Sequence, residues 1–519
     1  MKPSDELFQL VKSMSGKEKL FFRKKYLQLT DDADSNYLKL FNEISVQTDK
    51  EKIYYESKIK SGKYSGKFLK NLSFHKNYLY NLILNSLSHN NRDQSDVFLI
   101  RNLMTQAEIL SKRMLYDQSQ KLLQKAKRLS SEKDLFSIKY EILNKERHLI
   151  KQTATMEEFS AQNDILFSEQ YRIVELLMNS LDFYKLNFTV GTFLMSFGSG
   201  RVRGKDSLKE FEEMFDSPLL NDIEHAKTFL TKYIFHNIKL QYHLTKEEYK
   251  DAHKHAHAAV ELCECNMDKL LTAMDNYVFA LSNLLNCQIR LKLFNEFDST
   301  AEVMKKLPKI YPESISEYNK VFIFYSLSVY KLSKNMEHFN IEALKIQDEE
   351  IQSELPLYEE RITKYQKIIL YFFLSASHFV REDFANCIHW NSKMFNLEKS
   401  DLSEDYQCYA RIIQLIAYFE LGYHDSLEYV LKSVYHFISR KKKVYKYENI
   451  IQRYLRRTFR IKTDAELMDM FEEMKLEIEK LLDDPFERNA LDAFNILYWL
   501  ESKIRKVSMV EVMTAKKNP

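Results

Sequence analysis

The side chains best suited to bind a metal lie between residues 253 and 265 of this chain. His253, His257 and Glu261 recur every fourth residue, so on a helix all three share one face, and Cys263 and Cys265 follow. Imidazole, carboxylate and thiolate groups are the usual ligands of zinc. On a helix, however, Cys263 and Cys265 point in different directions, and no second segment obviously completes four ligands. We therefore expect no metal and no cofactor, and interpret the histidines as the exposed face of a helix.

A glycine-rich stretch, residues 197–206, suggests a second chemistry, the binding of phosphate. A P-loop needs glycine five residues before Gly204 and serine or threonine after Lys205, but this chain has Ser199 and Asp206 there. We expect a loop that interrupts the fold, with an anion contact as the alternative use of its basic residues, Arg201, Arg203 and Lys205. Because no nucleophile elbow, zincin helix, dinucleotide fingerprint or kinase motif occurs either, we predict that the protein is not an enzyme.

Glycine and proline are scarce, at 8 and 7 of 519 residues. A β-rich protein of this size requires many turns, and turns use both residues. Their scarcity predicts an all-α fold of long helices joined by short loops. Hydrophobic residues make up 45% of the chain and charged residues 29%, which is typical of a folded chain and not of a disordered one.

Net charge, apolar segments and cysteine usage indicate the cellular location that we expect for the protein. The net charge of +3 is too small to point to a partner. The longest apolar run, residues 368–376, is far shorter than the ~20 residues of a membrane span, and the N-terminus has no secretory signal pattern. Five scattered cysteines are typical of reduced thiols. We therefore expect a cytoplasmic protein with no membrane contact.

A pattern of aromatic and small residues repeats along the middle of the chain. An aromatic residue is followed three positions later by a small one, and seven further on by another small or apolar one. The copies are Tyr116, Ser119 and Ala126; Tyr249, Ala252 and Ala259; Phe384, Cys387 and Met394; and Tyr423, Ser426 and Ser433, with looser copies at Phe294, Phe297 and Met304 and at Phe339 and Ala343. The aromatic positions from Tyr249 to Phe384 are 45 residues apart, and the last interval is 39. Such regular spacing predicts stacked pairs of antiparallel helices, an α-α solenoid.

These residues resemble the tetratricopeptide repeat (TPR), whose second helix opens with Tyr-Asp-x-Ala and has another alanine seven residues on. Tyr116, Asp117, Ser119 and Ala126 match best. The period near 45 departs from the family's 34 residues, and the Trp-Leu-Gly consensus is absent. The resemblance implies an α-α superhelix that serves as a non-catalytic scaffold and binds a peptide or protein partner in its concave groove.

In the register of that family, the groove is lined by the first helix of each pair. The partner-binding residues implied are Arg101, Glu108, Phe372, Phe379, Arg411 and Tyr418. Aromatic and arginine side chains are common anchors in interfaces. The alternative is that the phenylalanines only form the core between the helices.

The repeats divide the chain into three regions. Residues 1–98 predict an N-terminal helical bundle of five helices, residues 99–439 the TPR-like repeats, and residues 440–519 a set of C-terminal capping helices. Within residues 440–462 the basic side chains, which include Arg453, Arg456 and Arg457, precede an acidic block at 464–487. We interpret the two blocks as neighbouring helices that neutralise each other, with a nucleic-acid patch as the alternative.

Residues 58–76 suggest a second function, because they hold six lysines and no acidic residue. Lys63, Lys67 and Lys70 lie there beside aromatic residues, and lysines of this kind contact nucleic-acid phosphates. The alternative hypothesis is therefore a nucleic-acid-associated regulator, with a basic N-terminal domain and a sensing domain built from the repeats.

The nucleic-acid hypothesis predicts salt-dependent retention of the protein on DNA or heparin. Replacing Lys63, Lys67 and Lys70 with alanine should then lower the slope of log affinity against log salt by up to about 3, because three phosphate contacts are lost. Elution in a salt gradient measures this. A variant lacking three lysines of the repeat region is the control, and no retention at about 50 mM salt contradicts the hypothesis.

Overall fold

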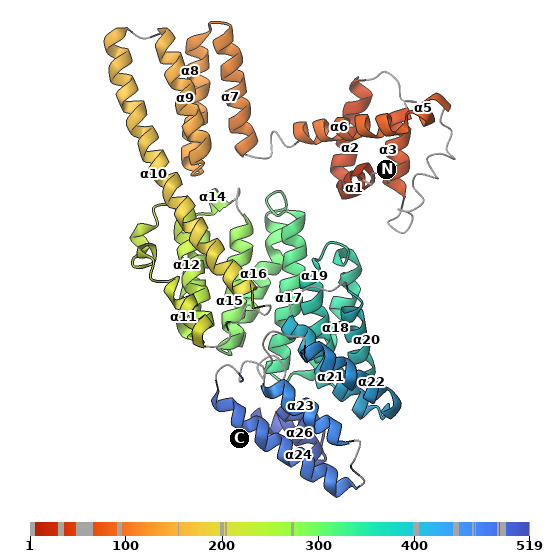
Figure 1. The fold of residues 1–519 in the computed structure, drawn as a ribbon. Helices are drawn as coiled ribbons and strands as arrows, with labels where there is room; N and C mark the ends of the chain where they lie inside the picture. Colours follow the sequence, from red (N-terminus) through yellow and green to blue (C-terminus); the bar gives the residue numbers. More distant parts are fainter. Residues whose placement is uncertain are drawn as a thin grey trace. The chain divides into compact units, whose positions relative to one another are not determined.

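The fold is helical throughout the part of the chain that the computed structural model describes. The described residues are 6–29, 36–47, 66–90, 96–153, 155–197, 202, 205–270, 274–397, 404–439, 446–458, 461, 463–484, 487 and 495–517. All their regular secondary structure is helix and none is strand (Figure 1). The all-α prediction is therefore confirmed. Among these residues, no helix is long and apolar enough to cross a membrane.

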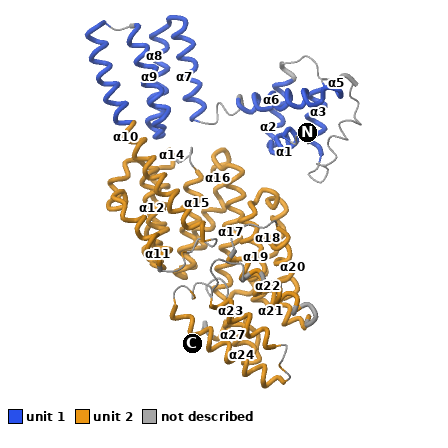
Figure 2. Tube along the Cα trace, in the orientation of Figure 1, with its two compact units in different colours: residues 1–173 blue, residues 174–519 orange. Residues whose placement is uncertain are grey.

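The chain forms two compact units, residues 1–173 and residues 174–519 (Figure 2). The division falls inside one long helix, α10 (Met156–Met195). The other helices of the first unit are α1 (Glu6–Ser13), α2 (Gly16–Leu29), α3 (Asn36–Val46), α5 (Gly66–Lys70), α6 (Leu72–Asn90), α7 (Asp96–Lys112), α8 (Tyr116–Glu132) and α9 (Phe136–Thr153).

The first helices of this unit pack around a small core. Phe8, Phe22 and Phe41 of α1, α2 and α3 are buried together, and all three helices contact α6. α2 begins at a capping box, in which the Ser15 backbone N–H donates to Glu18 at 2.7 Å and the Glu18 N–H to the Ser15 hydroxyl at 3.3 Å. Residues 49–62 of the predicted five-helix bundle lie outside the described residues.

The second unit contains most of the remaining helices. They are α11 (Lys205–Glu213), the short 3-10 helices η3 (Pro218–Leu220) and η4 (Ile223–His225), α12 (Phe229–Thr245), α13 (Tyr249–Glu264), α14 (Met267–Leu270), α15 (Met274–Arg290), α16 (Phe294–Ile310), α17 (Glu317–Glu337), α18 (Ile341–Tyr358), α19 (Lys364–Val380), α20 (Phe384–Phe395), α21 (Glu404–Glu420), α22 (His424–Ser439), α23 (Lys446–Arg457), α24 (Asp464–Glu479), the 3-10 helix η6 (Lys480–Asp483), α26 (Ile496–Arg505) and α27 (Met509–Lys517).

Successive helices of this unit pack in pairs. α12 contacts α13, α15 contacts α16, and the same holds for α17 with α18, α19 with α20 and α21 with α22 (Figure 1). First helices of neighbouring pairs also touch, since α15 contacts α17, α17 contacts α19 and α19 contacts α21. This packing is consistent with a helical-repeat protein, in which each pair buries its apolar side against the next.

One main-chain turn connects the two helices of each pair. Its central residue has a positive φ of 54° to 69°, and the turn occurs at Met114, Asp134, Glu247, Lys292, Phe339, Glu382, Gly422 and Lys506. At Lys292, the Lys292 N–H donates to the Ile289 carbonyl at 3.0 Å and the Leu293 N–H to the Gln288 carbonyl at 2.8 Å. These two bonds are the Schellman motif, which ends one helix and lets the chain reverse within three residues.

Counting from the turn gives the register of the second helix. The fifth and twelfth residues after the positive-φ residue are buried in six hairpins: Ser119 and Ala126, Ala252 and Ala259, Phe297 and Met304, Leu344 and Ile351, Cys387 and Met394, and Leu427 and Val434. These positions share burial and not a small side chain, since their residues range in size from alanine to phenylalanine.

This register corrects two of the predicted copies. Phe339 does not open a second helix, because it is the turn residue itself, and Leu344 is buried where Ala343 is only half-buried. In the last hairpin the buried residues are Leu427 and Val434, one position after the predicted serines. The side chains of Ser426 and Ser433 lie outside the described residues.

The turn residue Gly422 gives a test of this geometry. Gly422→Ala should lower the free energy of unfolding by about 1 kcal/mol, because alanine at positive φ is strained, whereas its Cβ would meet no atom within 4 Å. Gly191→Ala, inside α10 and equally open, is the matched control and should raise that free energy by about 0.5–1 kcal/mol. Urea denaturation followed by circular dichroism measures both. Equal effects of the two substitutions would contradict the turn.

Candidate protein-interaction site

The structure places two of the predicted partner-binding residues in the hydrophobic core. Phe372 is 0% exposed and Phe379 1% exposed, and both pack among the buried residues of α19 and its neighbours. A partner cannot touch these rings without unpacking the helices around them. Their assignment as groove anchors is therefore corrected, and the alternative, core packing, describes both.

The other predicted partner-binding residues reach the surface to different extents. Arg101 is exposed, and so is Glu108, whose pKa is lowered by Lys112 and Lys145, each 3.1 Å away. Arg411 is half-buried, because its guanidinium lies over the rings of Phe395 and Phe437, at 4.4 and 3.7 Å from their centroids. Tyr418 is half-buried as well. Arg101 and Glu108 are therefore open to a partner in the first unit, whereas Arg411 and Tyr418 are only partly accessible in the second.

Two of the three arginines of α23 pair with acidic residues of α24. Arg453 donates to Glu477, and Arg457 to Glu473 at 2.6 Å. Arg456 lies over the ring of Tyr435, 4.6 Å from its centroid. The predicted neutralisation between the two charged blocks is therefore confirmed for Arg453 and Arg457, which reduces the positive charge open to a nucleic acid. Of the N-terminal lysines, Lys70 is exposed at the end of α5, whereas Lys63 and the side chain of Lys67 lie outside the described residues.

The two patterns considered first for chemistry are not assembled into sites. Cys263 is buried in the core, whereas His257 and Glu261 are exposed on α13 and Cys265 is exposed just after it, so the residues considered as zinc ligands do not converge. Of the glycine-rich stretch 197–206, residues 198–201 and 203–204 lie outside the described residues.

The second-unit part of α10 carries a stripe of exposed apolar side chains. Six large residues lie along one side of the helix and are 41% to 73% exposed: Val174, Met178, Leu181, Tyr184, Phe188 and Met195. We call this set the α10 stripe. Since most members are three, four or seven residues apart, they share a face of the helix.

The opposite side of α10 is also apolar, and it is buried. Phe183, Val190 and Leu194 belong to the core that α10 shares with α11, α12 and the helices that follow. Asn179 fixes the same side, since it accepts from the Lys227 N–H at 3.0 Å and donates to the His225 carbonyl at 2.9 Å. A helix that is apolar on two sides is normally buried on both. The α10 stripe is therefore the surface of this unit that most needs a covering partner.

A second surface feature lies between α18 and α20. It is a groove of about 300 Å³, lined by Gln352, Leu355, Pro356, Glu359, Ala385, Asn386, His389, Trp390 and Lys393. The Lys393 ammonium lies 4.6 Å from the centre of the Trp390 ring. Its lining is mostly polar, which suits a hydrophilic segment better than an apolar helix.

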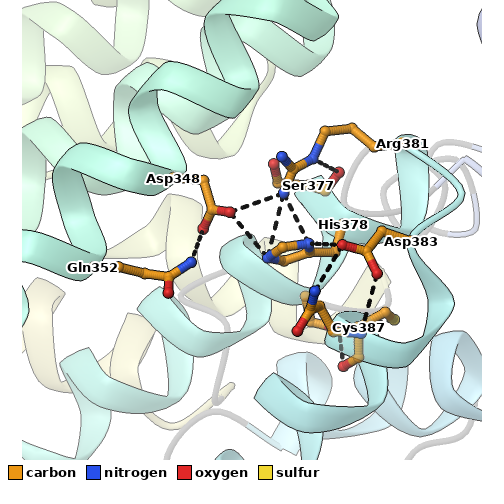
Figure 3. Close-up of polar contacts among 9 residues, drawn as sticks. Asp348, Gln352, Ser377, His378, Arg381, Asp383 and Cys387 are labelled. Carbon is orange, nitrogen blue, oxygen red and sulfur yellow. Dashed lines mark hydrogen bonds and ion pairs between the residues drawn. The ribbon is translucent and has the colours of Figure 1, made fainter.

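Beside this groove, charged side chains cluster where α18, α19 and α20 meet (Figure 3). Asp348 and His378 are buried, whereas the Asp383 side chain is 38% exposed. The His378 ring lies between two carboxylates, with Nε2 at 3.2 Å from Asp348 and Nδ1 at 3.0 Å from Asp383. Arg381 donates to the same Asp348 oxygen at 3.0 Å, and Gln352 to the other at 3.0 Å. The cluster therefore joins three helices by charge.

These contacts decide the charge state of Asp348. Burial by itself would raise its pKa, but the hydrogen bonds from His378, Gln352 and Arg381 outweigh burial and lower the pKa to about 2. Nearby, burial raises the pKa of the Cys387 thiol to about 12, so this cysteine is protonated at neutral pH and is not an activated nucleophile. The cluster is suited to holding helices together and not to nucleophilic catalysis.

The cluster has a relative in another hairpin. His378 to Phe384 read HFVREDF, and His243 to Tyr249, 135 residues earlier, read HLTKEEY. In both hairpins the histidine is in the last turn of the first helix and contacts the acid before the second helix, His378 with Asp383 and His243 with Glu248 at 2.7 Å. The shared pattern is a histidine, then a base, glutamate and a second acid. This pattern is readable in the sequence. However, it lies just before the aromatic residue that opens each predicted copy, and the repeat pattern described above therefore does not include it.

Comparison of the chain with protein-family models, with curated proteins and with solved structures gives no match. The class of the protein therefore rests on its fold, an all-α chain of consecutively packed helix pairs.

Asp348→Asn tests the stabilising role of the cluster. At pH 7 it should lower the free energy of unfolding by about 2–3 kcal/mol, since a buried carboxylate that pairs with Arg381 and His378 is lost. Because the folded pKa is lowered, the contribution is complete above about pH 4 and is lost as the pH falls towards 2.

Urea denaturation of wild type and variant at several pH values measures this difference. Glu350→Gln, which removes an exposed charge from the same helix, is the matched control and should change stability by less than about 0.5 kcal/mol. If the loss of unfolding free energy caused by Asp348→Asn stayed constant from pH 7 to pH 3, the stabilising role of the ionised Asp348 carboxylate would be contradicted.

Proposed function

We propose that this protein is a non-catalytic interaction scaffold, a TPR-like helical-repeat protein arranged as an α-α superhelix, and that it binds an amphipathic helix of a partner protein on the α10 stripe. The observation that carries the proposal is the set of six large apolar side chains left open on a helix whose other side is already buried.

The size of the α10 stripe supports a binding role. Side chains of this size expose about 150–250 Å² when fully open, so six that are roughly half exposed leave on the order of 600 Å² of apolar surface. Patches of this size on a monomer are often functional, and a standard interface buries about 800 Å² on each partner. Covering the stripe contributes roughly 15 kcal/mol before costs, against about 4–15 kcal/mol lost on association.

The geometry of the stripe favours a helical partner. Its residues form a straight row along several turns of one helix, which matches the i, i+3, i+4 and i+7 anchors of an amphipathic helix. Lys185 is also exposed on this helix, near the stripe. An acidic side chain at the edge of the partner's apolar face would pair with it.

The repeat architecture supports the same class of function. Five helix pairs from α12 to α22 follow one another, and the same turn joins the two helices of each pair. The last four pairs are in contact through their first helices, and the first pair contacts the second through α13 and α15. Repeats of this kind provide long surfaces for partners and not a single enclosed site. The nucleic-acid alternative has less support, because Arg453 and Arg457 are paired within the chain.

Site-specific photo-crosslinking tests the proposal. A benzophenone side chain in place of Phe188 should yield a covalent adduct with a partner protein in living cells, whereas one in place of Asp182, which is exposed on α10 but is not part of the α10 stripe, should not. Adding Met178→Glu to the Phe188 probe should weaken the adduct at least about tenfold, since a charge would enter an apolar contact.

Melting temperatures of all variants show whether the fold is kept. The proposal fails if neither position yields an adduct, if both yield the same one, or if the protein runs as a partnerless monomer in cell extract.

A further inference from the structure

The hairpin of α12 and α13 concentrates histidines at one end. α12 supplies His236 and His243, and α13 supplies His253 and His255. On α13, His253 faces α16, where its ring is 3.7 Å from Glu296, whereas His255 faces α12, where its Nδ1 is 3.0 Å from Nδ1 of His236. The side of α13 that faces α12 therefore differs from the side that carries His253, His257 and Glu261, the residues considered in the sequence analysis.

Three potential ligands converge at the turn between the two helices. They are His243, Glu248 and Asp251, and one ligand atom from each lies within 4.8 Å of the other two. The His243 ring also stacks on the His255 ring, with centroids 5.4 Å apart and planes 10° apart. This stacking fixes the orientation of the imidazole that faces the two carboxylates.

The main-chain turn preorganises these ligands. The Glu248 N–H donates to the His243 carbonyl at 2.9 Å, which is the longer-range bond of the Schellman motif, so the two residues are held together by the backbone. Asp251 is in the first turn of α13, one turn from His255. A site whose ligands are already close loses little conformational entropy when it binds an ion.

The surroundings of His243 differ from those of His378 in the related hairpin at residues 378–383. There, Nε2 of His378, the ring nitrogen that faces away from Asp383, is 3.2 Å from Asp348, and Arg381 contacts both ring nitrogens. In the α12–α13 hairpin the equivalent base, Lys246, instead pairs with Glu212 of α11. The only other ion pair on the three ligands in the described residues is an exposed one between Lys254 and Asp251, at 2.7 Å, and such pairs are weak.

We propose that His243, Glu248 and Asp251 form a binding site for a divalent transition metal, Zn²⁺ in the first instance, with water at the remaining position. One imidazole and two carboxylates are ligands that zinc takes, and three protein ligands with an open position are common. The imidazole favours Zn²⁺ over Mg²⁺, which prefers oxygen ligands alone. The ion would tie the last turn of α12 to the first turn of α13, and this role is independent of the α10 stripe.

Isothermal titration calorimetry of the full-length, metal-free protein with Zn²⁺ tests the site. We expect one ion per chain, no binding of Mg²⁺ under the same conditions, and a rise in melting temperature with Zn²⁺. His243→Ala and Asp251→Asn should each weaken the affinity at least about tenfold. Co²⁺ should give a visible absorption band in the wild type that is lost in His243→Ala.

His253→Ala and His257→Ala are the matched controls, because they remove imidazoles from the other side of the same helix. Both should bind Zn²⁺ as the wild type does. The proposal is overturned if Zn²⁺ does not bind, if His243→Ala binds it unchanged while circular dichroism shows the native helix content, or if only the control variants lose it.

Discussion

A three-residue reversal of the main chain is the constraint on which this structure depends. At each Schellman turn a residue with positive φ ends one helix, and the chain at once begins the next. The two helices must then run antiparallel and in contact. Their register is fixed too, because the fifth and twelfth residues after the turn face the first helix.

A single pair of this kind is not a stable unit. Its two helices bury one side against each other but leave other apolar residues open, and these residues are covered only by the neighbouring pairs. The contacts between α15, α17, α19 and α21 supply this cover. Where the succession ends, other elements take over. The ring centroids of Trp499 in α26 and Phe471 in α24 are 5.2 Å apart. The Trp499 indole N–H donates a hydrogen bond of 2.6 Å to Glu420, at the end of α21.

The same need for cover connects the fold to its proposed uses. The second-unit part of α10 has a buried side and an open apolar side, and nothing in the described residues of its own unit covers the α10 stripe. The turn itself places a histidine next to an acid in two hairpins. In one hairpin the surrounding charges close the group into a buried ion cluster, and in the other they leave three ligands facing each other. Neighbouring helices therefore decide whether one local motif stabilises the fold or offers a site.

Several features follow from local chemistry and are readable in the sequence. Scarce glycine and proline determine an all-α chain, and Ser119, Ala126, Ala252 and Ala259 mark the contact side of second helices, because side-chain spacing and size act within a single hairpin. The pairing of Arg453 with Glu477 follows from two adjacent blocks of opposite charge.

Only the tertiary structure decided the rest. It buries Phe372 and Phe379 and leaves Phe188 open, since exposure depends on helices that are distant in sequence. It also brings His243 to Asp251 within one hairpin, because the turn between α12 and α13 folds the chain back on itself. The turns were equally hidden, because seven of the eight positive-φ positions among the described residues carry a residue other than glycine. A side chain gives no local sign of a conformation that the packing of two helices imposes on it.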